Sequence, residues 1–123
     1  MRRIGVKADK DPVSVTFVSK GHISRLLGTR GMSVLDRVLR QIELESLQAR
    51  WPIFGIEVRH VKDNEIPAWE YVRITPYFRV AFEAADEYLQ SLYGALDSLA
   101  GSLSAEEQSI FQRLIYFDVG TAS

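Results

Sequence analysis

The chain of 123 residues contains no cysteine, and this absence excludes several kinds of chemistry at once. Disulfide bonds, catalytic thiolates and cysteine-ligated zinc sites all require a residue that the chain does not have. Histidine is almost as scarce, because His22 and His60 are the only two. Neither has a second potential ligand at a spacing typical of metal sites. We therefore expect no metal ion and no cofactor.

Long hydrophobic runs are also absent. No stretch approaches the roughly 18 consecutive apolar residues that a membrane span requires. Two arginines follow the first methionine, but the apolar segment of a signal peptide does not come after them. We expect a cytoplasmic protein with no membrane partner.

Neither sign of charge dominates, but the charges are unevenly distributed. The net charge is −1. Residues 1–50 contain ten Lys and Arg against five Asp and Glu, whereas residues 51–123 contain five against eleven. Such asymmetry is typical of a basic surface for nucleic acid. It is equally typical of two halves that attract each other within the fold or across a dimer.

Strict alternation of apolar and polar residues predicts four strands, at about residues 13–18, 53–61, 69–75 and 115–119. Each has one apolar face, as in a sheet that is covered on one side. In the second strand, Phe54 shares the apolar face with Ile56, Val58 and His60. Pro76 lacks an amide hydrogen, so we expect it to end the third strand.

Three helices are predicted from start signals and helical spacing. Ser33 with Asp36 forms an S-x-x-D signal, which predicts a helix from there to about residue 49, after a short helical turn interrupted by GTRG at residues 28–31. A second long helix runs from about residue 80 to Gly101. The capping box S-A-E-E at residues 104–107 predicts a short third helix.

The order strand, helix, strand, strand, helix, strand matches the ferredoxin-like split β-α-β arrangement, with an extra short helix before the last strand. We therefore expect an α+β domain over residues 12–119, with two helices on one face of a four-stranded antiparallel sheet. In that fold the first and third strands lie in the middle. Residues 1–11 are interpreted as a flexible N-terminus and residues 120–123 as a tail.

The sheet face away from the helices carries an unusual set of side chains for a surface in water. It would display the rings of Trp69, Tyr71 and Tyr116 together with Arg59 and Arg73. Aromatic residues and arginine are enriched at protein interfaces. We interpret this face as the interface of a protein-interaction domain, most simply a homo-oligomer such as a dimer.

Within that interpretation, the two arginines would pair with Glu57 and Asp118. The alternative is that the rings only cover one another as cross-strand pairs, without any partner. No cluster of catalytic residues is visible, since the acidic residues near residue 83 suit the first turn of a helix. A non-enzymatic domain is therefore favoured, and an enzyme or small-molecule sensor built at a dimer cleft is the third alternative.

Nucleic-acid binding through the basic N-terminal half is the second hypothesis. Its candidate residues surround a possible helix-turn-helix in residues 21–41: Lys20, Arg25, Arg30, Arg37 and Arg40. Against it, Val34, Leu35 and Val38 have the spacing of core residues, at positions where a recognition helix would read bases. The basic residues would then form a solvated face, packed toward the acidic second helix. The third strand also lacks the glycine and the spacing of an RRM motif.

Overall fold

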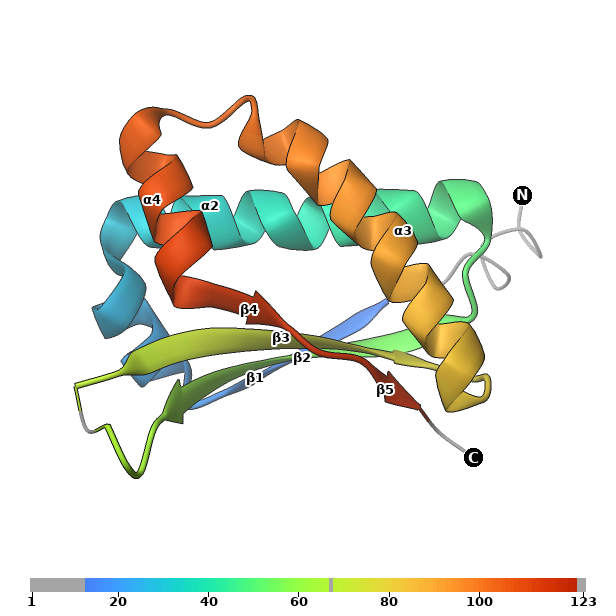
Figure 1. Cartoon of the computed structure of the whole chain (residues 1–123), viewed down its shortest axis with the longest axis horizontal. Coiled ribbons are helices and arrows are strands. Elements are labelled where there is room, and N and C mark those ends of the chain that lie inside the picture. The colour runs from blue at the N-terminus through green and yellow to red at the C-terminus, as the bar shows by residue number, and fades with distance from the viewer. Residues whose placement is uncertain (1–12, 67, 122–123) are drawn as a thin grey trace, which may run out of the picture.

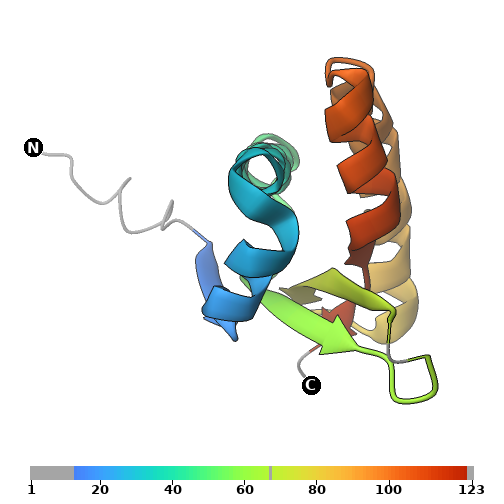
Figure 2. The same cartoon turned by 90° about the vertical axis from the view of Figure 1, so that its left-hand side faces the viewer.

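The computed structural model describes residues 13–66 and 68–121 and shows a mixed α+β fold (Figure 1). Five strands form one sheet, and three helices lie on one of its faces. Figure 2 shows that no described element covers the other face. The elements are β1 (Ser14–Val18), α2 (Lys20–Ala49), β2 (Ile53–Lys62), β3 (Glu70–Phe78), α3 (Phe82–Ala100), α4 (Ala105–Leu114), β4 (Ile115–Phe117) and β5 (Gly120–Thr121).

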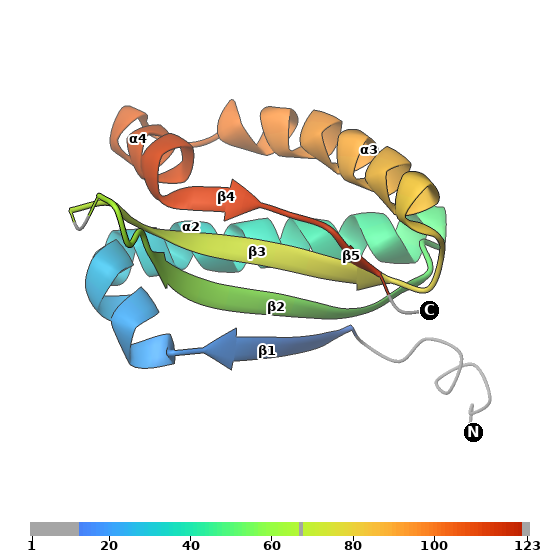
Figure 3. The same cartoon turned by 60° about the horizontal axis from the view of Figure 1, so that its bottom comes forward.

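The strands follow one another across the sheet in the order β1-β2-β3-β4, and β5 continues the line of β4 along β3 (Figure 3). β1 is parallel to β2, β2 is antiparallel to β3, and β3 is parallel to β4 and β5. The ferredoxin-like order is therefore not confirmed, because β2 and β3 occupy the centre and the sheet is mixed. Each helical crossover returns the chain to the position directly beside the preceding strand, which makes the new pair parallel. The alternation of apolar and polar residues within one strand does not indicate which other strand lies beside it, so the strand order could not be predicted from this pattern.

The core lies between the sheet and the helices, and it uses the predicted apolar faces. Ile56 and Val58 of β2 and Val72 and Ile74 of β3 are buried beneath the helices. The helical stripes that cover them consist of Val34, Leu35, Val38 and Ile42 of α2 and Ala85, Leu89, Leu92 and Leu96 of α3. Burial of these side chains is the main stabilising contribution to the fold.

The helix α2 includes both the short helical turn predicted before GTRG and the long helix predicted after it, and it begins at Lys20. Gly28 has φ 71° and ψ −179°, so the helix breaks at this residue and resumes directly after it. This backbone conformation is almost restricted to glycine. Ser33 consequently lies inside the helix and caps nothing. The predicted capping box of α4 is confirmed, since Ser104 and Glu107 each bond the backbone N–H of the other.

Pro76 does not end β3, which continues to Phe78. The carbonyl of Ile74 accepts a hydrogen bond from the N–H of Asp118, so the backbone of Ile74 faces the β4 side. Alternate residues face the same side of a strand. Pro76 therefore faces the break between β4 and β5, where no amide hydrogen is needed.

Two further expectations differ from the structure near the strand ends. The sequence predicts a tail over residues 120–123, yet Gly120 and Thr121 form β5 and pair with Tyr77 and Phe78. A register shift between Ile53 and Gly55 forms a β-bulge in β2. The bulge turns Phe54 away from the core face that the alternation predicts, and its ring lies 6.1 Å from that of Tyr77. Residues 1–11, predicted as a flexible N-terminus, and residues 122–123 lie outside the described residues.

Candidate functional site: the open sheet face

We use the name open face for the side of the sheet opposite the helices. All strands except β5 contribute side chains to it, since their exposed faces alternate with the buried ones. Its residues are Ser14 and Thr16 of β1, Phe54, Gly55, Glu57 and Arg59 of β2, Tyr71, Arg73, Thr75 and Tyr77 of β3, Tyr116 of β4, and Trp69 just before β3.

One end of the open face holds an aromatic cluster formed by Trp69, Tyr71 and Tyr116. The ring centroids lie 5.1 Å apart for Trp69 and Tyr71, 5.0 Å for Tyr71 and Tyr116, and 6.2 Å for Trp69 and Tyr116. The structure thus brings together the three aromatic residues that the sequence analysis selected. They pack edge to face or tilted, which stabilises the sheet. Even so, Trp69 and Tyr116 each remain 40% exposed.

The middle of the open face is charged. Arg59 donates two hydrogen bonds to the Glu57 carboxylate, at 3.0 and 3.3 Å. These bonds, with a smaller contribution from the nearby charge of Arg73, hold the pKa of Glu57 below its usual value. The predicted pairing of Arg59 with Glu57 is therefore present.

Arg73 is in a different position from Arg59. It lies opposite Arg59 on β2 and beside Tyr116 on β4. Its Nε is buried, and within residues 13–66 and 68–121 this atom has no hydrogen-bond partner. Asp118, the other acid predicted to pair with the two arginines, accepts a bond from the backbone N–H of Val119. The centre of the open face thus holds a guanidinium whose buried Nε has no hydrogen-bond acceptor among the described residues, while its charge still acts on the nearby Glu57 carboxylate.

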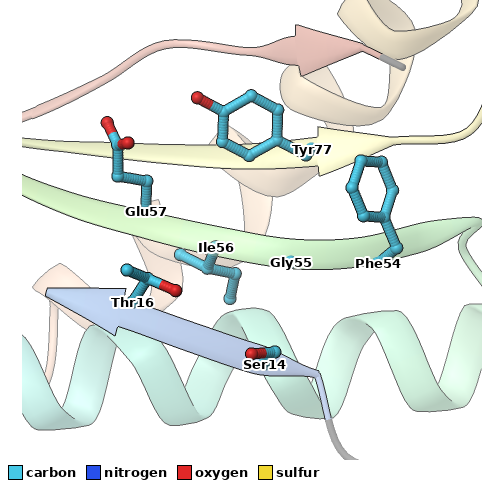
Figure 4. A pocket seen from close by; sticks show the side chains of 7 residues that line it. All are labelled: Ser14, Thr16, Phe54, Gly55, Ile56, Glu57 and Tyr77. Atoms are coloured by element: carbon cyan, nitrogen blue, oxygen red, sulfur yellow. The ribbon is translucent and has the colours of Figure 1, made fainter. Parts of the chain in front are cut away.

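The other end of the open face contains a hollow of about 320 Å³ above Gly55 (Figure 4). It exists because Gly55 has no side chain between its neighbours on the three strands. Phe54, Tyr77 and Glu57 stand around it, with Ser14 and Thr16 on the β1 side. Arg79 lies over the Phe54 ring, 4.6 Å from its centroid. The sequence does not predict this hollow, because a bulge cannot be recognised from alternation alone.

The basic residues of the nucleic-acid hypothesis are spread along α2, and three of them form salt bridges. Arg30 binds Glu106, Arg37 binds Ser102 and Glu107, and Arg40 binds Asp36. Arg25 donates to His22, and the Lys20 ammonium lies over the Phe17 ring. The acidic residues that face α2, Glu106 and Glu107, lie in the first turn of α4. The sequence predicts instead that the acidic residues of the second long helix face these basic residues. Pairing of this kind lowers the positive potential that binding to phosphates requires.

The two histidines come together, which no local signal in the sequence indicated. Their rings stack at 5.2 Å between centroids, and His60 is hydrogen-bonded to Glu70 at 2.8 Å. This bond lowers the pKa of the Glu70 carboxyl. The described part of the chain contains no group of three or more His, Cys, Asp or Glu side chains that could hold a metal ion.

Comparison of the chain with protein-family models, with curated proteins and with solved structures finds no match. Among the described residues, none of the helices has both the length and the hydrophobicity to cross a membrane.

Proposed function

We propose that the chain is a non-enzymatic protein-interaction domain that self-associates through the open face. The observation that carries the proposal is the environment of Arg73, a charged group at the centre of the face whose Nε has no hydrogen-bond acceptor among the described residues. A buried N–H without an acceptor costs about 1–3 kcal/mol. The Arg73 side chain as a whole is half-buried, so a partner that supplies a carboxylate can approach its charge from the open face.

The open face is complementary to a second copy of itself. It carries both signs of charge, so a two-fold axis in the plane between two sheets brings Glu57 of one copy toward Arg73 of the other. Arg73 lies near the middle of β3, between the aromatic cluster and the Gly55 hollow. An axis that crosses the strands one residue further along, level with Ile74, places the cluster of each copy over the hollow of the other and brings Glu57 of one copy to the level of Arg73 of the other. Aromatic anchors that fill pockets are the usual source of binding energy at such interfaces.

Nucleic-acid binding is less well supported by the same residues. The rings of the aromatic cluster meet at steep angles of 66° and 84° around Tyr116, so they do not form the parallel row on which bases stack. The salt bridges of Arg30, Arg37 and Arg40 also reduce the charge available on α2.

The test is the solution mass, measured by light scattering during size-exclusion chromatography at low and high salt. We expect the wild type to be at least a dimer at both salt concentrations, because aromatic contacts are not screened. The double variant Trp69→Ala/Tyr71→Ala should have a lower mass with an unchanged circular dichroism spectrum. Phe82→Ala is the matched control, because Phe82 is an exposed aromatic residue on α3, outside the open face. A monomeric wild type, or a double variant of unchanged mass, would refute the proposal.

A further inference from the structure

The outer edge of β1 is a second surface with the properties of a binding site. Among the described residues, β1 pairs only with β2, and no described element lies beside its other edge (Figure 3). Natural proteins usually protect such an edge with lysine, proline or a bulge. The strand, Ser14–Val18, contains no lysine and no proline and pairs with β2 without a register shift.

The opposite edge of the sheet is protected in several ways. β4 has three residues and β5 has two, and the two strands are interrupted at Asp118 and Val119. The rings of Tyr93 from α3 and Phe111 from α4 pack against Phe117, each at 6.2 Å between centroids. Of the two described edges of the sheet, only the outer edge of β1 is unprotected and can pair with another strand.

A groove runs along β1 on the side covered by helices. It has a volume of about 320 Å³ and lies between β1 and α2. Its apolar lining comes from Val15, Phe17, Leu39 and Ile56, and Val15 is 37% exposed. Because side chains alternate along a strand, a strand added beside β1 would direct every second side chain into this groove.

We propose that the occupant is β1 of a second copy, paired antiparallel to the first and centred on Thr16. The sequence SVTFV suits this pairing, because it is apolar on both sides of its central threonine. Val15 of each copy then lies opposite Phe17 of the other, on the groove side, and the two copies of Thr16 face each other on the open-face side. Pairs of a β-branched and an aromatic residue, and pairs of threonines, are favourable across strands.

Pairing through β1 is compatible with association through the open face. Pairing through β1 has its two-fold axis perpendicular to the sheet, so both copies keep their helices on one side and their open faces join. Two such pairs can then stack into a closed assembly of four copies.

The pairing of β1 does not depend on the proposed function, and one set of variants separates the two. Thr16→Lys places two ammonium groups opposite each other at the centre of the β1 pair. Thr16 is exposed, so the fold of each copy should tolerate the change. Thr121→Lys is the matched control, since Thr121 is an exposed threonine on the protected edge. Each change is made in the wild type and in the Trp69→Ala/Tyr71→Ala variant, and the mass is measured by light scattering.

We expect the Trp69→Ala/Tyr71→Ala variant to remain a dimer, and the addition of Thr16→Lys to halve its mass, whereas Thr121→Lys leaves it unchanged. If only the open-face proposal fails, the Trp69→Ala/Tyr71→Ala variant keeps the wild-type mass while Thr16→Lys lowers it. If the Trp69→Ala/Tyr71→Ala variant is already a monomer, or if Thr16→Lys leaves its mass unchanged, the β1 pairing is refuted; the wild-type background alone does not decide, because Thr16 also lies beside the Gly55 hollow. Hydrogen exchange provides a second readout, because outward amides of β1 should become protected as the concentration rises. Amides that exchange at the same rate at all concentrations, or that become protected only with an added peptide, would also overturn the proposal.

Discussion

Arg73 lies directly opposite Arg59 in the ladder between β2 and β3. Like charges at directly opposed positions destabilise a sheet. Arg59 is compensated by Glu57, but the buried Nε of Arg73 has no partner in the described chain. We therefore expect the isolated subunit to be less stable than it would be with an uncharged side chain at residue 73.

The first prediction concerns this arginine. Arg73→Met keeps an unbranched apolar stem and removes the charge, so we expect the free energy of unfolding of the subunit to rise by about 0.5–1 kcal/mol. The same change should weaken self-association through the open face. Urea denaturation of dilute protein measures the first effect and light scattering the second. Arg59→Met is the control, and should lower stability because it leaves Glu57 unpaired. A loss of stability in Arg73→Met would show that its charge is compensated within the subunit.

A second prediction concerns the break in α2. Gly28→Ala forces a side chain into a backbone conformation that only glycine adopts readily, and should lower the free energy of unfolding by about 1–3 kcal/mol. Gly94→Ala is the matched control inside α3, where an added Cβ meets no atom within 4 Å. It should raise stability by about 0.5–1 kcal/mol, because alanine favours helix. Equal effects of the two changes in thermal or urea unfolding would mean that Gly28 is helical in solution.

The third prediction concerns Gly120 of β5, which lies beneath the ring of Tyr77. An added Cβ at residue 120 would overlap with the ring atoms of Tyr77. Gly120→Ala should therefore lower the free energy of unfolding by about 1–3 kcal/mol. A double-mutant cycle with Tyr77→Ala checks the cause, since removal of the ring should abolish most of the effect. Gly55→Ala is the control, because its Cβ would meet only the Ser14 carbonyl oxygen, at 3.7 Å. Additive effects in the cycle would contradict the explanation.

The fourth prediction is the direction of the pH dependence of stability. The pKa values of Glu57, Glu70 and Glu107 lie below the ordinary value of 4.5, through hydrogen bonds from Arg59, from His60 and from the backbone N–H of Ser104, respectively. A carboxyl with a lowered pKa stabilises the fold above its unfolded-state pKa, and the contribution is lost as the pH falls through the folded-state value. Stability should thus decline below pH 4.5. Glu107→Gln should reduce this decline in urea titrations, and a stability independent of pH in that range would exclude the effect.

Much of the fold follows from local patterns. Alternation identified β1, β2, β3 and β4, and helical spacing identified the stripes that cover them, because burial of one face imposes these periods on the sequence. The order of the strands could not be obtained in this way, since it depends on where each crossover returns the chain. The signal at Ser33 was misleading for a similar reason. A serine three residues before an acid has the spacing of a cap, but here the helix had already begun.

The candidate site was predicted in part. Trp69, Tyr71, Arg73, Arg59 and Tyr116 do share one face, as alternation requires. Phe54 and the Gly55 hollow were missed because the β-bulge reverses the direction of one side chain, and Tyr77 was missed because β3 continues past Pro76. His22 and His60 are 38 residues apart in the sequence, and their rings stack on each other. The periodic patterns of apolar residues do not predict contacts between such distant segments.

Pro76 has a consequence for the accuracy of folding. If β4 and β5 moved two residues along β3, a strand that needs a donor would face the one residue that has none. A movement of one residue would turn Ile115 and Phe117 toward water. Pro76 therefore disfavours a shift of the C-terminal strands by two residues along β3, and the alternation of buried and exposed residues disfavours a shift by one residue. Pro76 restricts which sheets the chain can form, rather than adding a contact to the one it does form.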